Sequence, residues 1–142
     1  MKRSLLTEGD GVPIGLAIDG ANRNDFKLVK ATLESIPVER PVAGSGQLQG
    51  LGLDKGCDCD EVRELAATFG YTTHIRSRGE EAQALKRKTR FRARRWVVDR
   101  THSWLNRFRR ILIRWEKKAD NYLALLHFAC AIITDRCAGV LG

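Results

Sequence analysis

Residues Arg92 to Lys118 read RARRWVVDRTHSWLNRFRRILIRWEKK, and this stretch predicts the element around which the chain is organised. Its apolar positions recur at alternating steps of four and three residues. That spacing is typical of one face of a helix that packs on a core. The positions are Val97, Thr101, Trp104, Phe108, Ile111 and Trp115. We therefore predict one long helix over residues 92–118.

A second, polar face of this helix carries Arg95, Asp99, His102 and Asn106 at the same helical steps. Asp99 is an acid among arginines, and two interpretations of it are open. It forms an ordinary ion pair with Arg95 or Arg100, as residues one turn apart on a helix commonly do. Alternatively, it presents a metal-binding carboxylate to a phosphodiester.

The charge of the chain is concentrated in one block. Residues 76–118 contain 16 Lys/Arg and 4 Asp/Glu, whereas the remaining residues contain 9 basic and 13 acidic groups. A basic block on an acidic scaffold indicates a polyanionic partner, with nucleic acid first, although ribosomal or membrane-surface binding gives a similar bias. The residues predicted to contact DNA are Arg92, Arg94, Arg95, Arg100, Arg107, Arg109, Arg110, Arg114, Lys117 and Lys118.

Length and cysteine content indicate a single domain over residues 1–142 with reduced thiols. A zinc site from Cys57, Cys59 and the distant Cys130 and Cys137 is an alternative, but the first pair lacks the usual spacing. The longest apolar run, 122–133, is too short to span a bilayer and predicts a buried helix. We expect no membrane association.

The rest of the chain alternates between strand and helix patterns. A hairpin is predicted around the turn at residues 8–11, and an N-cap at Asn24 opens the first helix. Asp58 and Glu61 form a capping-box-like pair that opens the second helix. The predicted strands are 2–6, 12–18, 51–54 and 71–75, and the other predicted helices are 25–35, 58–69 and 121–137. This order predicts an α/β fold with one mixed sheet and flanking helices.

Asp54 ends a predicted strand and is followed by Lys55 and Gly56. Ligands of α/β sheets collect at such strand ends, and Mg²⁺ accepts one or two carboxylates plus water and phosphate oxygens. Asp54 and Asp99 together are candidates for a two-metal site that cuts phosphodiesters. The alternative for Asp54 is a turn cap or a pair with Lys55.

Three segments carry a resemblance to a known family. LDKGCD at 53–58, THIRSRGEE at 73–81 and the long string 94–133 resemble DDE transposases of bacterial insertion sequences, the insertion-sequence-five branch in particular. KRSLLTEGDG at 2–11 and GANRND at 20–25 extend the match over nearly the whole chain. The resemblance implies an RNase H-like core with three Mg²⁺-binding acids that cuts and rejoins DNA at element ends. By position, Asp54 matches the second aspartate and Asp99 the final acid.

The chain departs from the family pattern in several places. The first catalytic aspartate lies on a central strand upstream of the hairpin in the family, and Met1 begins without that strand or the DNA-end-binding region. The final acid is usually Glu rather than Asp. Arg95 fits the family arginine, whereas the tyrosine position falls at Arg92 and the lysine position at Asn106, with Arg107 adjacent.

The resemblance therefore implies an incomplete RNase H-like sheet in which the central first strand is missing. The hairpin and the Asp54 strand would each show an unpaired inner edge, open to the N-terminal half of a transposase or another copy. Asp19 as a replacement acid would lie roughly 10 Å away, two strand spacings, which is too far to share a metal. Glu116 is a competing acid that we expect to form a salt bridge instead.

Two histidines have predicted roles. His102 lies one turn from Asp99 and is a candidate for orienting a phosphate. His127, in an apolar helix, is expected in the core.

Three hypotheses follow for the function. The first is the C-terminal catalytic portion of an insertion-sequence transposase, inactive alone and located in the bacterial cytoplasm with the nucleoid. The second is a non-enzymatic DNA-binding remnant of such an enzyme. The third is a metal-dependent nuclease unrelated to transposition.

Overall fold

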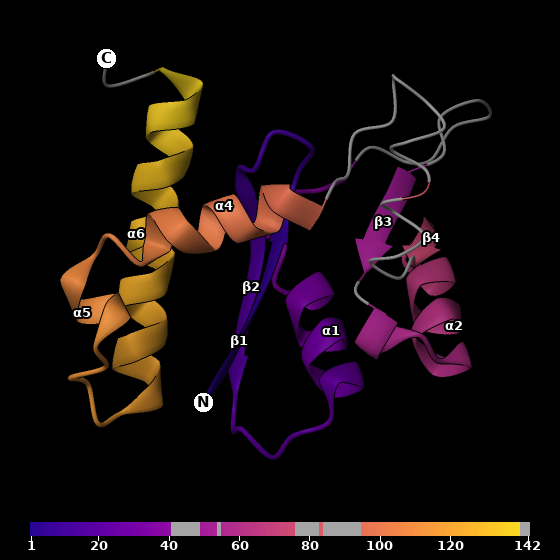
Figure 1. The fold of residues 1–142 in the computed structure, drawn as a ribbon, viewed down its shortest axis with the longest axis horizontal. Coiled ribbons are helices and arrows are strands. Elements are labelled where there is room, and N and C mark those ends of the chain that lie inside the picture. The colour runs from indigo at the N-terminus through magenta and orange to yellow at the C-terminus, as the bar shows by residue number, and fades with distance from the viewer. Residues whose placement is uncertain (41–48, 54, 76–82, 84–94, 140–142) are drawn as a thin grey trace.

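A computed structural model of the chain describes residues 1–40, 49–53, 55–75, 83 and 95–139. The α/β class predicted from the sequence is confirmed. The elements are β1 (Lys2–Thr7), β2 (Pro13–Asp19), α1 (Asp25–Glu34), β3 (Gln49–Leu53), the short 3₁₀ helix η1 (Lys55–Cys57), α2 (Asp60–Thr68), β4 (Tyr71–Ile75), α4 (Arg95–Leu105), α5 (Arg109–Leu112) and α6 (Ala119–Ala138). Figure 1 shows α6 at one end, β3, β4 and α2 at the other, and the β1–β2 hairpin with α1 between them.

The hairpin forms as predicted, with β1 and β2 antiparallel. Its turn closes through Gly11, whose φ of +91° favours glycine. A Cβ at this position would also lie 2.9 Å from the guanidinium of Arg100 and 3.1 Å from the hydroxyl of Thr101. Gly11 therefore permits both the turn and the close approach of α4 to the hairpin.

Strand β2 is covered on both sides, as its apolar sequence predicts. Leu16 lies in a core cluster with residues of α6, whereas a Cβ at Gly15 would meet the carbonyl oxygen of Thr32 on α1 at 2.8 Å. The predicted N-cap is also confirmed, because the Asn24 side chain accepts a hydrogen bond from the amide of Phe26 at 3.2 Å. Helix α1 therefore packs directly on the hairpin.

The described strands form two separate sheets rather than the single mixed sheet that we predicted. β1 pairs with β2, and β3 pairs in parallel with β4, from Gln49 opposite Tyr71 to Leu53 opposite Ile75. In the described part of the chain, β1 and β3 each have a neighbour on one side only. This agrees with the expected unpaired inner edges.

The predicted cap of the second helix is wrong. Helix α2 begins at Asp60 after the extended residue Cys59, and no side chain caps it. Asp58 lies outside the helix and pairs with Arg63 at 2.6 Å. The carboxylate of Asp58 is therefore engaged by a guanidinium rather than by the helix amides.

The predicted long helix over 92–118 is also wrong, because the chain breaks between α4 and α5. The amides of Arg107 and Phe108 bond to carbonyls three residues earlier, and Phe108 has extended backbone angles. Phe108 and Ile111 then pack on the cluster that includes α6, where the Tyr122 hydroxyl donates to the Ile111 carbonyl at 3.3 Å. Trp115, assigned to the buried stripe, is 71% exposed.

Helix α6 agrees with its predicted range, with buried residues at Tyr122, Leu126, Ala129 and Ile133. One core cluster joins these residues to Leu16 and to α4 and α5, and a second joins α1, α2 and β3. Within the described ranges, no helix is both long and apolar enough to cross a membrane.

Candidate functional site

Asp99, one of the two predicted catalytic acids, lies exposed on α4. Helix α4 crosses the hairpin in Figure 1. Asp54 lies outside the described residues, so the predicted pairing of the two acids stays a prediction. Among the described side chains, Asp99 forms no ion pair. Its carboxylate is therefore available to solvent on the surface of α4.

The position of α4 is fixed by two hydrogen-bonded contacts with the hairpin. The hydroxyl of Thr101, fully buried, donates to the carbonyl of Gly11 at 2.7 Å. At the other end of α4, the guanidinium of Arg3 donates to the side-chain oxygen of Asn106 at 3.1 Å. Asp99 therefore stands on a helix that is held near both of its ends.

His102 lies half-buried between Arg3 and Asp99. Burial lowers the pKa of its imidazole most, the positive charge of Arg3 lowers it further, and the negative charge of Asp99 opposes them. The ring is therefore mainly neutral near neutral pH. A neutral ring can donate one hydrogen bond to a phosphate oxygen but adds no positive charge, which narrows the predicted phosphate-orienting role.

Arg100 has a structural position rather than an open one. Its guanidinium lies 4.6 Å from the ring centre of Trp96 and 4.8 Å from that of Trp104, and it donates to the carbonyl of Asp10. Stacking on two aromatic faces is a cation–π arrangement. Both the predicted DNA contact of Arg100 and its predicted pairing with Asp99 therefore compete with these contacts.

The other predicted DNA-binding residues divide into three groups. Arg92 and Arg94 lie outside the described residues, and the side chain of Arg95 is not described. Arg110 pairs with Glu116 at 3.0 Å, and Arg114 donates to the carbonyls of Glu116 and Lys117. The side chains that are exposed, with no side-chain partner among the described residues, are Arg107, Arg109, Lys117 and Lys118.

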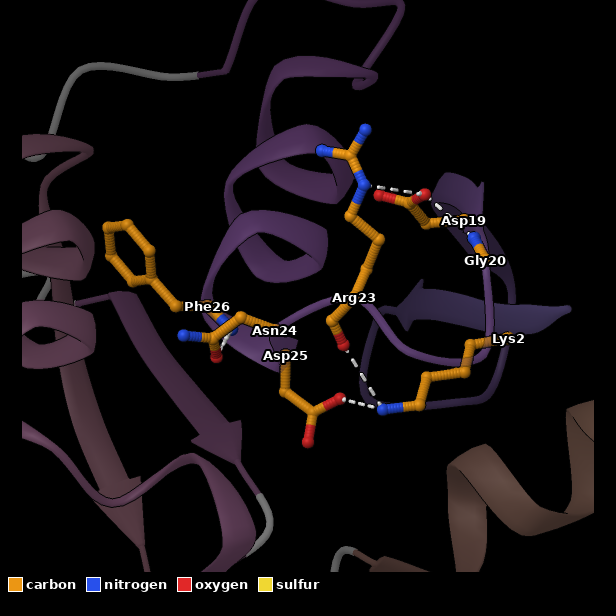
Figure 2. Close-up of polar contacts among 7 residues, drawn as sticks. All are labelled: Lys2, Asp19, Gly20, Arg23, Asn24, Asp25 and Phe26. Carbon is orange, nitrogen blue, oxygen red and sulfur yellow. Dashed lines mark hydrogen bonds and ion pairs between the residues drawn. The ribbon is translucent and has the colours of Figure 1, made fainter.

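The predicted salt bridge of Glu116 is confirmed by its pair with Arg110. The side chain of Glu116 is only 10% exposed. Asp19, considered as a replacement acid, accepts from the Gly20 amide at 2.7 Å and lies 3.4 Å from Arg23 (Figure 2). Both acids therefore have local structural partners.

The prediction that His127 lies in the core is wrong, since it is exposed on α6. The reason is the phase of the helix. Tyr122, Leu126 and Ala129 define the buried face, and His127 follows Leu126 by one residue, about 100° around the axis.

The described residues contain no group of three or more His, Cys, Asp or Glu side chains that could hold a metal. All four cysteines are free, and nothing in the described chain gathers them into a zinc site. Asp99 offers one accessible carboxylate, which fits a hard oxygen-seeking cation such as Mg²⁺ in part only, because such a site uses one or two carboxylates with water.

Sequence reasoning missed Arg3 and the stack of Trp96, Arg100 and Trp104. Arg3 belongs to a strand that is 103 residues distant from Asn106, so no local pattern reports the contact. The spacing of Trp96, Arg100 and Trp104 is a detectable signal, because residues four apart on a helix are neighbours. The assignment of Arg100 to DNA rests on charge alone and takes no account of that spacing.

The comparisons with known proteins agree with the resemblance described above. The family described as Transposase DDE domain matches residues 51–134, more than half of the chain. The chain is also 33% identical over 138 residues to a Burkholderia cepacia protein described as a transposase for insertion sequence element IS402, covering 93% of this chain and 61% of that protein. The chain thus spans under two thirds of that relative's length. No solved structure matches it. This chain belongs to the DDE transposases of insertion sequences.

Proposed function

We propose that the chain is the C-terminal catalytic portion of an insertion-sequence transposase that cuts and rejoins DNA in the bacterial cytoplasm, associated with the nucleoid. The two described half-sheets are, in this proposal, parts of an incomplete RNase H-like core of the insertion-sequence-five type. The observation that carries the proposal is the exposed Asp99 on a helix held at both ends against the hairpin.

Fixed placement matters because a metal-binding carboxylate works only in a narrow geometry. The contacts of Thr101 and Asn106 hold the backbone of α4, while the side chain of Asp99 remains free to coordinate. Asp54, which follows β3, is the proposed second ligand. Bound Mg²⁺ would activate the attacking hydroxyl and stabilise the leaving oxygen.

The exposed basic residues near the end of α4 would hold the DNA backbone. Arg107 and Arg109 lie in the turn and at the start of α5, only a few residues beyond Asp99. Guanidinium groups bind phosphates through two parallel hydrogen bonds, which orients the strand as well as attracting it. The proposed partners are therefore element ends and target DNA.

The test compares three variants of two acids in a reconstituted full-length enzyme. Asp99→Ala is expected to lower Mg²⁺-dependent strand cleavage by about a hundredfold or more, which corresponds to about 2.7 kcal/mol of transition-state stabilisation. Asp99→Glu should keep activity, because the carboxylate is retained. Glu116→Ala is the control and should lower the melting temperature rather than the metal-dependent rate of the folded enzyme.

Loss of cleavage in folded Glu116→Ala, with Asp99→Ala still active, would contradict the assignment. The 142-residue polypeptide alone is expected to show no cleavage, because the family's first catalytic acid is not among its residues. Mg²⁺-dependent cleavage by this polypeptide alone would overturn the proposed division of the active site.

A second candidate function is a non-enzymatic DNA-binding remnant. It is favoured by the exposed cations at Arg107, Arg109, Lys117 and Lys118, which can bind phosphates without any acid. Binding by the chain, together with no cleavage by the reconstituted enzyme, would select this alternative. Absence of DNA affinity at low salt would contradict both candidates.

A further inference from the structure

A groove of about 470 Å³ lies between the two sheets, lined by β1 on one side and β3 on the other. Leu5, Leu6 and Thr7 belong to one side, and residues 49–53 form the other. The edges of β1 and β3 that have no neighbour in the described chain therefore border the same space. Figure 1 shows this space between the hairpin and the β3–β4 pair.

The two borders run in opposite directions. Figure 1 shows β1 leading upward from the N-terminus and β3 running downward. One extended segment between them would consequently lie antiparallel to β1 and parallel to β3. Both edges offer backbone donors and acceptors, so a single strand can join the two sheets into one mixed sheet.

The other two walls decide which side chains such a strand would carry. Val29 and Leu33 of α1 line one wall, and Val97 and Val98 of α4 line another. A strand covered by helices on both faces has apolar residues at successive positions rather than alternating ones. The groove thus fits a short run rich in Val, Ile or Leu.

We propose that this groove accepts one apolar β-strand supplied by the part of a transposase polypeptide that the chain does not match. The IS402 relative is 61% covered, which leaves 39% of its length (100 − 61) as a source of that strand. The proposal rests on the proposed function for the identity of the donor. Its geometric basis is independent of DNA and of metal.

The experiment uses the unmatched 39% of the IS402 relative (100 − 61) as a separate polypeptide. Hydrogen–deuterium exchange of the 142-residue chain is followed with and without it. Exchange is expected to slow at least about tenfold in 2–7 and 49–53 together, because one strand pairs with both edges. The same polypeptide joined to Met1 by a Gly/Ser linker removes the dependence on intermolecular affinity.

Two valines provide a matched pair of variants. Val98→Asp places a charge in the groove wall and should weaken complex formation by about tenfold or more. Val38→Asp is the control, because Val38 is 66% exposed and is not among the groove-lining residues. Circular dichroism of both free variants establishes that they are folded.

Protection of only one edge, or of neither edge in the linked protein, would overturn the proposal. Concentration-dependent protection of the chain alone would do so as well, since the occupant would then be a second copy. Protection of both edges in a protein that shows no Mg²⁺-dependent cleavage would sustain this inference while removing the proposed function.

Discussion

Arg3 on β1 donates a hydrogen bond to the side chain of Asn106 just beyond α4, with 3.1 Å between the two atoms. This contact joins the first strand of the chain to the helix that carries Asp99. It also brings a positive charge close to His102, whose pKa it lowers. The other terminal nitrogen of Arg3 is buried and has no partner in the described chain. The environment of His102 therefore reports directly on the docking of α4.

Arg3→Met is expected to raise the pKa of His102, because a nearby positive charge disfavours the imidazolium and the variant removes it. Asp99→Asn is expected to lower the same pKa, since it removes the opposing negative charge. Titration of the His102 ring by NMR in the folded chain measures both shifts. Shifts of the same sign in the two variants would contradict the described arrangement.

Stability should fall as the pH is lowered through the range in which unfolded histidine titrates. The folded pKa of His102 lies below the ordinary value of about 6.5, so the unfolded chain takes up the proton first. The stabilising contribution is present above that value and is lost as the pH falls through the folded pKa. Urea midpoints between about pH 7.5 and about pH 5.5 should show this loss, and His102→Gln should reduce it. His127→Gln, at an exposed site, should leave the pH dependence unchanged.

Thr101→Val should destabilise the chain by about 1–3 kcal/mol, because it leaves the carbonyl of Gly11 near α4 without its donor. The side chains have nearly the same shape, so packing is preserved. Thr68→Val is the matched control, since Thr68 is exposed and bonds only within its own helix. It should change the free energy of unfolding by no more than about 0.5 kcal/mol. Equal effects of the two variants in urea unfolding would argue against the hairpin contact.

The double variant Arg107→Gln and Arg109→Gln should lower the slope of log Kd against log salt by about 0.9 for each DNA phosphate that it no longer neutralises. Arg100→Gln should leave that slope unchanged and lower the melting temperature, because Arg100 contacts two tryptophan rings and the Asp10 carbonyl. Fluorescence anisotropy with a labelled duplex at several salt concentrations measures the slope. A reduced slope only in Arg100→Gln would reverse our assignment.

Cys130 should react with iodoacetamide more slowly than Cys137 at about pH 8, because burial raises its pKa to about 11 and the thiolate is the nucleophile. Cys137 is exposed near the end of the same helix. Mass spectrometry of peptides after timed alkylation measures both rates. Unfolding in urea should bring the two rates together, and a persistent difference would show that folding is not its cause.

Local patterns predict much of the secondary structure. The hairpin, the cap at Asn24 and the range of α6 follow from residues within a few positions of one another. The range 92–118 is predicted as one helix because its apolar spacing continues through Phe108 and Ile111. The packing of these residues on α6 favours a turn there, and a one-dimensional period does not contain that information.

The candidate site divides in the same way. The sequence by itself identified Asp99 as the acid of α4, the basic block around it and the family, because charge and motif are local properties. Only the tertiary structure decided which cations remain exposed, that Arg3 reaches Asn106, and that β1 and β3 border one groove. Those relationships depend on contacts between residues far apart along the chain. Their energies are set by burial and geometry, which exist only once the chain has folded.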